Sequence, residues 1–136
     1  MVAYTTSTTH MEYSNAEYKY QKENYPDMSL INDTVPSAES SEKVDTAYSK
    51  AKELLKANSE LAGFTGAASV DILGEAQAVE ELGLIDKVSI VGVGTPNCNK
   101  RVCQKWYDKC GVPVGSGDQQ DMLCVIWLTR CYQAMK

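Results

Sequence analysis

The hydrophobic pattern between Leu61 and Pro96 predicts a strand, a helix and a second strand in succession. Leu61–Ala68 is a short apolar run that contains glycines and has the length of a buried strand. Ser69–Leu84 then carries apolar residues at helical spacing, with Asp71 at the expected N-cap and Gly83 at the expected end. Lys87–Gly94 is apolar on both faces, as a central parallel strand requires.

Two parallel strands joined by a helix form a βαβ unit, and this geometry indicates where a ligand binds. In open parallel sheets, ligands collect at the carboxyl ends of the strands. In this chain those ends are the loops Gly66–Asp71 and Gly94–Asn97. We therefore expect the functional residues to lie in these two loops and in the loop after the first strand.

The first part of the chain predicts a strand at Val2–Ser7 and a helix that follows it. Thr9 and Glu12 have the spacing of a capping box, and the helix is expected to end near Asn24, before Pro26. We expect one face of this helix to pack on the sheet. That face consists of Tyr13, Ala16 and Tyr20.

A second strand is predicted at Met28–Val35, followed by a helix that opens in the acidic segment Ser37–Glu42. Asn58 is the expected end of that helix. Its expected buried face consists of Val44, Ala47, Ala51, Leu54 and Leu55.

The order β-α-β-α-β-α-β predicts an α/β fold, a three-layer α/β/α domain with a parallel sheet of about four strands. Residues 1–97 form this single domain. The pattern changes in residues 98–136, where all five cysteines occur. These are Cys98, Cys103, Cys110, Cys124 and Cys131.

Charge and composition exclude several classes of protein. The 13 basic and 18 acidic residues give a net charge of −5, which provides no electrostatic footprint for nucleic acid. No run approaches the roughly 20 apolar residues that cross a bilayer, and the start lacks the features of a signal peptide, so the chain as written is expected to stay in the cytosol. The cysteines show no CxxC or Cys/His spacing, and we expect no metal and no cofactor.

Catalysis is also not expected. His10 is the only histidine, and its own loop provides no cysteine and no evident carboxylate partner. Gly92-Val93-Gly94 after a strand is a weak match to a dinucleotide-binding motif, because Asn97 stands where the third glycine belongs. We therefore expect a binding protein and not an enzyme.

Five segments resemble one family in order and spacing. They read TSTTH, EYKYQKENYPDM, AYSKAKELLKANSELAGFTG, GEAQAVEELGL and KVSIVGVGTPN, and they fall between Thr6 and Asn97. Together they resemble type I periplasmic sugar-binding proteins, most closely the subgroup that binds autoinducer-2, rhamnose and similar sugars for ABC importers. The resemblance covers Val2–Asn97 and implies the carboxyl-side lobe of a protein whose two lobes close on the sugar.

The family resemblance stops near Asn97, and the sequence beyond it suggests a frameshift. Shifted by one base, the codons of KWYDKCGVPVGSGD permit NGTISAVSLWDPA, which resembles the family's strand and Trp-Asp-Pro ligand loop. Our hypothesis is a frameshift between about Asn97 and Lys105, which leaves 98–136 out of frame. The alternative is that this cysteine-bearing tail is genuine.

The resemblance also indicates candidate ligand-binding residues. They are His10, Ser69, Asp71, Thr95, Thr6 and Thr8. Each has a structural alternative: His10 as a helix-start histidine bonded to a nearby carbonyl, Asp71 as a helix cap, and the threonines as loop residues that satisfy backbone groups. One carboxylate can both cap a helix and bind a sugar.

The expected function is binding of a small sugar or furanosyl signal, as all or part of the substrate-binding component of an ABC importer. The resemblance implies an importer permease as partner of the full-length parent and a periplasmic or extracytoplasmic location for the family. The alternatives are the sensor core of a sugar-responsive transcription regulator and a free-standing α/β enzyme. We also expect weak sugar binding by a single lobe, and self-association through an exposed sheet edge at Val88–Val93.

Overall fold

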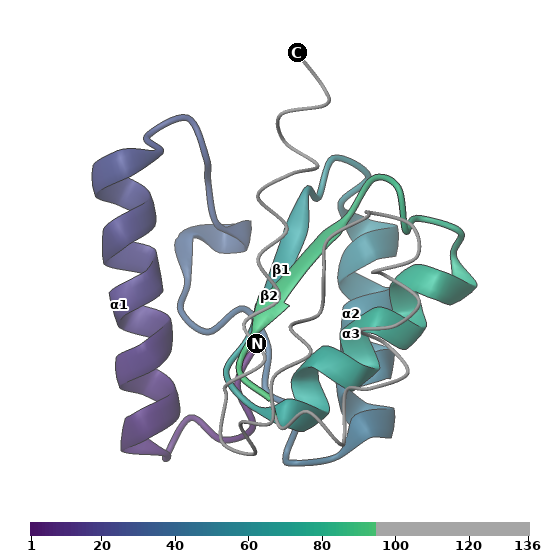
Figure 1. Ribbon diagram of the computed structural model, residues 1–136, viewed down its shortest axis with the longest axis horizontal. Helices are drawn as coiled ribbons and strands as arrows, with labels where there is room; N and C mark the ends of the chain where they lie inside the picture. Colours follow the sequence, from purple (N-terminus) through teal and green to yellow (C-terminus); the bar gives the residue numbers. More distant parts are fainter. Residues whose placement is uncertain (95–136) are drawn as a thin grey trace, which may run out of the picture.

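Two parallel strands and three α-helices make up the part of the chain that the computed structural model describes, residues 1–94 (Figure 1). In chain order the elements are α1 (Thr8–Asn24), the 3-10 helix η1 (Ile31–Asp33), α2 (Val44–Ala57), β1 (Gly63–Gly66), α3 (Ser69–Glu81) and β2 (Ser89–Gly92). β1 pairs with β2 in parallel, with Phe64 opposite Ile90. The predicted strand–helix–strand unit is confirmed, and the protein is of the mixed α/β type.

The ends of α3 show why this unit was predictable and where the prediction was wrong. Gly83 follows the helix with a φ of +67°, a conformation that glycine adopts without strain, as expected. The N-cap, however, is Ala68 and not Asp71. Alanine has no side-chain acceptor for the first turn, and only the reciprocal half of a capping box is present: Asp71 accepts the Ala68 N–H at 3.0 Å.

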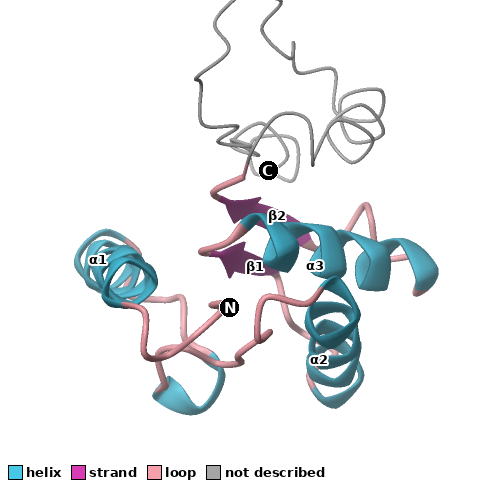
Figure 2. Ribbon diagram, turned by 90° about the horizontal axis from the view of Figure 1, so that it is seen from below, coloured by secondary structure: helices cyan, strands magenta, loops and turns pink. Residues whose placement is uncertain are grey.

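The hydrophobic core lies between the strands and the pair α2 and α3, which pack on each other. Of the predicted face of α2, Ala47, Ala51 and Leu55 are buried, whereas Val44 and Leu54 are half-buried. The core is completed by Phe64, Ile72, Ala76, Val79, Val88 and Ile90. Figure 2 shows α2 and α3 on one side of the strands and α1 on the other.

The first strand is much shorter than predicted. Only Val2 forms a bridge, in parallel with Glu39, and the Ser40 N–H donates to the Val2 carbonyl at 2.9 Å. On its other side this segment meets β1, because the Ala67 N–H donates to the Met1 carbonyl at 3.0 Å. Residues 1–94 therefore contain a two-stranded sheet and one isolated bridge, fewer strands than the four expected.

The chain leaves this extended segment early because Ser7 already caps α1. The Ser7 hydroxyl accepts the His10 N–H at 3.5 Å, so the predicted cap at Thr9 is two residues too late. Serine is the somewhat better N-cap of the two residue types, but both are favoured, and the pattern T-S-T-T offers several candidates. The predicted end at Asn24 is confirmed.

The predictions for residues 28–42 were wrong. Met28–Val35 contains η1 instead of a strand, and the Met28 side chain is 56% exposed. Ser37–Glu42 does not open a helix: it holds the bridge residue Glu39, and Ser41 and Glu42 have φ values of 54° and 58°. These two left-handed residues turn the chain into α2, which begins at Val44. The predicted end of this helix is confirmed, because Asn58 is its C-cap.

The predicted packing face of α1 is also wrong. Ala16 and Tyr20 are exposed, and Ser14 is the buried residue of this helix. α1 instead meets β1 through polar side chains: Glu17 lies close enough to Thr65 and Tyr13 for their side chains to lower the pKa of its carboxyl, against the larger effect of burial. Burial raises the pKa of the Glu17 carboxyl, and burial with the Glu17 charge raises that of Tyr13 to about 12.

A helix needs about 20 predominantly apolar residues to cross a bilayer. Within residues 1–94, none combines the length and the apolar character needed to cross a bilayer.

Candidate functional site

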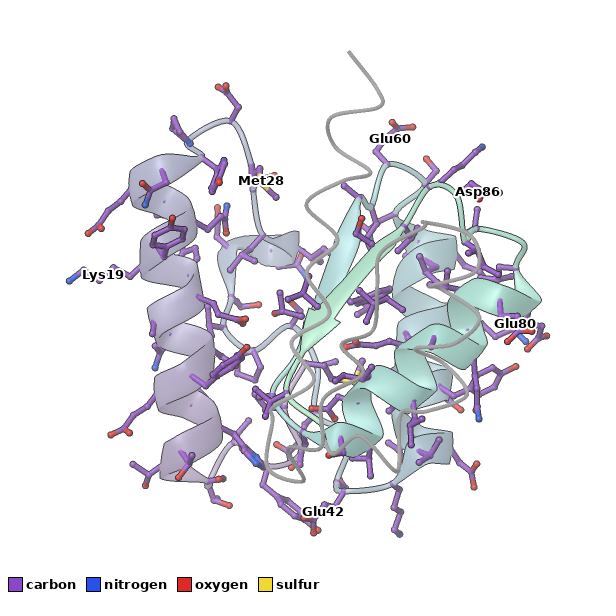
Figure 3. All side chains as sticks on the ribbon, viewed as in Figure 1. Lys19, Met28, Glu42, Glu60, Glu80 and Asp86 are labelled. Carbon is purple, nitrogen blue, oxygen red and sulfur yellow. The ribbon has the colours of Figure 1, made fainter. Side chains whose placement is uncertain are left out.

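A shallow pocket of about 310 Å³ lies at the carboxyl ends of β1 and β2. Its walls come from the loop after β1, from Val93 just after β2, from the first turn of α1 and from the segment before α2. The lining residues are His10, Glu42, Ala67, Ala68, Ser69, Val70 and Val93. Figure 3 shows Glu42 at this end of the molecule, with Glu60 and Asp86 at the opposite end.

Two of the predicted site residues, His10 and Ser69, meet in this pocket. His10 belongs to the first turn of α1, and Ser69 is the first residue of α3. The His10 Nδ1 atom is buried and has no hydrogen-bond partner among the described residues. The structure thus brings together two residues that are far apart in sequence, at the strand ends where ligands are expected.

Asp71 does not line the pocket. Its side chain is fully buried, and its Oδ1 accepts a 2.5 Å hydrogen bond from the Ser40 hydroxyl. Its Oδ2 accepts the Ala68 N–H. Both carboxylate oxygens are therefore engaged within the protein, which agrees with the capping alternative for this residue.

The other candidates lie elsewhere. Thr6 and Thr8 are exposed and do not line the pocket. Thr95 lies outside the described residues, as do the tail 98–136 and the proposed frameshift.

Sequence reasoning missed Glu42 and the apolar walls Val70 and Val93. Glu42 had been placed in the first turn of a helix, whereas its positive φ puts it in the turn before α2. Nothing in the local sequence distinguishes these two conformations. The resulting pocket combines a carboxylate, an imidazole and a hydroxyl with two valines, which suits a small ligand that has both polar groups and an apolar face.

Gly92 has a packing role that replaces the weak dinucleotide interpretation. A Cβ atom at this position would clash with the carbonyl oxygen of Gly66 on the paired strand. The glycine allows β1 and β2 to approach each other near the pocket.

Among residues 1–94, no three histidine, cysteine, aspartate or glutamate side chains are arranged to hold a metal ion.

α3 also carries a buried acidic residue that does not line the pocket. Glu75 is fully buried, and neither of its carboxylate oxygens has a hydrogen-bond partner in the described part of the chain. Burial raises its pKa to about 8; the amino group of Met1 acts in the opposite direction, and the charges of Asp71 and Glu17 add to the increase. The neutral form of Glu75 is therefore favoured at physiological pH.

A comparison with protein-family models finds no match to this chain, and a search of the curated proteins finds no similar sequence. The resemblance to sugar-binding proteins therefore stays a prediction from the segments between Thr6 and Asn97.

Proposed function

We propose that this chain binds a small sugar or furanosyl signal in the pocket at the carboxyl ends of β1 and β2. One observation carries the proposal: His10 and Ser69, which the family resemblance selected, line a single pocket although they belong to different helices. In this proposal the chain is all or part of the substrate-binding component of an ABC importer. The permease and the periplasmic location belong to the full-length parent.

The chemistry of the pocket supports a sugar. The hydroxyl of Ser69, the imidazole of His10 and the carboxylate of Glu42 supply donors and acceptors for sugar hydroxyls. Val70 and Val93 supply apolar surface for a ring face. No step of bond making or breaking is part of the proposal.

The finer fold proposal is a four-stranded, three-layer lobe of the periplasmic-binding-protein-like type. It is supported by residues 1–3, which lie between β1 and the segment around Glu39, and by α1, which lies across the strands from α2 and α3 (Figure 2).

A titration with L-rhamnose, followed by amide chemical shifts, tests the proposed function. We expect shifts at His10, Ala68, Ser69 and Val93 with a dissociation constant in the millimolar range, because one lobe supplies only part of the contacts and does not exclude water. Dissociation constants of this order correspond to about 4 kcal/mol.

Variants of the pocket sharpen this test. His10→Ala and Ser69→Ala should each weaken binding by roughly 2- to 10-fold, the effect of one lost hydrogen bond, while Thr6→Ala at an exposed site should not. D-ribose serves as a second sugar. Shifts at none of these residues with either sugar would contradict sugar binding, and a micromolar dissociation constant would contradict the one-lobe explanation of weak binding.

We also propose that the outer edge of β2 supports self-association. Ser89 and Val93 donate their N–H groups to Ala62 and Gly66, so the alternate residues Ile90 and Gly92 direct their backbone groups to the other side. Among residues 1–94, β2 pairs only with β1, and residues 88–94 carry no charge that would protect the edge.

Sedimentation velocity tests this second proposal. We expect dimers or larger species at micromolar concentration and a shift toward monomer in Val91→Lys, because a lysine on an edge strand opposes pairing. Ser49→Lys adds the same charge on α2, away from the edge, and should leave the distribution unchanged. A monodisperse wild-type monomer would disprove edge pairing.

A further inference from the structure

The two walls of the pocket are joined by one buried pair of side chains. One wall is the loop Ala67–Val70, which leads into α3, and the other contains Glu42, two residues after Ser40. Ser40 and Asp71 are both fully buried, and the Ser40 hydroxyl donates to Asp71 Oδ1 at 2.5 Å. The same carboxylate accepts the Ala68 N–H at 3.0 Å through Oδ2. A single carboxylate therefore holds both walls.

Ser40 is itself fixed to the amino-terminal segment. Its backbone N–H donates to the Val2 carbonyl at 2.9 Å, and the neighbouring Ser41 N–H donates to the Ala3 carbonyl at 2.8 Å. Residues 41 and 42 then turn with positive φ and place Glu42 in the pocket. Ser40 and Glu42 are therefore separated by a single residue along this fixed segment.

We propose that Ser40 and Asp71 form a brace that sets the separation of the two pocket walls, so that Asp71 acts as a positioning residue for the bound sugar without touching it. The part of this inference that concerns the bound sugar rests on the proposed function. A cap alone would require only the Oδ2 bond to Ala68, whereas the Oδ1 bond reaches across to a segment 31 residues away. The second bond is what distinguishes a brace from a cap.

The surroundings of Asp71 are suited to this role. Burial of a carboxylate is costly unless its oxygens are hydrogen-bonded, and the first turn of α3 also favours negative charge. Glu75 lies one helical turn further along α3, close enough for the Asp71 charge to act on it. Because burial favours the neutral form of Glu75, this neighbour adds little negative charge beside Asp71.

Hydrogen exchange of the full chain tests the brace without any ligand. Ser40→Ala removes the link between the walls and leaves the Asp71–Ala68 bond in place. We expect amide exchange at Ala68, Ser41 and Lys43, whose N–H groups are hydrogen-bonded on the two walls, to become about tenfold faster, the loss expected for a bond to a charged group. Val79 in the body of α3 should change little. Ser14→Ala removes another buried hydroxyl, on α1, and should change none of these amides.

A second pair of variants tests Asp71 directly. Asp71→Asn keeps an acceptor for the Ala68 N–H and a polar partner for Ser40, so its exchange pattern should lie closer to the wild type than that of Asp71→Ala. Exchange that rises equally throughout α3 in Ser40→Ala, or that does not change near the pocket, would overturn the brace.

A measurement of sugar binding separates this inference from the proposed function. If L-rhamnose binds the wild type, Ser40→Ala should weaken it several-fold although Ser40 does not line the pocket; equal affinity would overturn the positioning role. If neither L-rhamnose nor D-ribose binds the wild type, the proposed function and the sugar role of the brace both fail. The exchange result would then decide the brace itself.

Discussion

Replacing Glu75 with glutamine is expected to stabilise the protein by an amount that grows as the pH rises. In the folded protein, burial raises the pKa of Glu75 from 4.5 to about 8. Between these two values the folded state holds one proton more than the unfolded state, so the free energy of unfolding falls as the pH rises. The loss is at most about 1.4 kcal/mol per pH unit. Glutamine cannot ionise and removes this loss.

Urea unfolding at pH 4, 7 and 8.5 measures the effect. The wild type and Glu75→Gln should have similar stability at the lowest pH. At pH 8.5 Glu75→Gln should be the more stable by several kcal/mol, an order-of-magnitude figure for one fully buried carboxyl. Glu17 and other groups titrate in both proteins, so the difference between them isolates Glu75.

Glu60→Gln is the matched control for this experiment, because it changes an exposed glutamate at the end of the molecule opposite the pocket (Figure 3). Its curve should run parallel to that of the wild type. If Glu75→Gln also ran parallel to the wild type, Glu75 would have to be ionised or hydrogen-bonded in the folded protein.

The part of the fold that was predicted correctly is the part whose signals are local. β1, α3 and β2 each carry their own apolar pattern, and Gly83 marks the end of α3 by itself. The apolar side of α2 is similarly complete within one segment. In each case the residues that decide the structure are close together in sequence, so a pattern of hydrophobic spacing is sufficient.

The incorrect predictions depend on contacts between distant residues. The bridge between Val2 and Glu39 falls in a polar segment that has no alternation of apolar residues, so nothing in residues 37–42 indicates an extended chain. α1 was given a packing face from its tyrosines, but tyrosine also tolerates water, and Tyr20 is 60% exposed. The side chains that bring α1 toward β1, among them Glu17 near Thr65, are polar and have no periodic signature.

The candidate site shows the same difference between local signals and contacts of distant residues. His10 and Ser69 were selected from a family pattern together with the rule that ligands bind at strand ends, and both line the pocket. Glu42 was missed because its position depends on two residues with positive φ. Asp71 was expected at the ligand, whereas in the structure it is buried against Ser40. No sequence pattern links residues so far apart.

Gly74→Ala is expected to destabilise the protein by about 3 kcal/mol or more, at the upper end of the cost of overpacking a core. Gly74 lies where α3 crosses α2, and a Cβ atom there would clash with Ala47 Cβ and lie 2.5 Å from the Tyr48 backbone nitrogen. Backbone atoms cannot rotate away as a flexible side chain does, so one helix has to move. Both helices contribute to the core, and this movement would disturb its packing.

The sign of the effect makes this a strict test of the α2–α3 packing. In a helix with free space at this position, alanine would be more stable than glycine by about 1 kcal/mol, because glycine loses more backbone entropy on folding. Thermal and urea unfolding of Gly74→Ala, compared with Gly83→Ala, separate the two cases. Gly83 has no atom within 4 Å of an added Cβ, so its substitution costs only the strain of a positive φ, about 1 kcal/mol. A Gly74→Ala protein as stable as the wild type would show that α2 and α3 do not approach each other this closely.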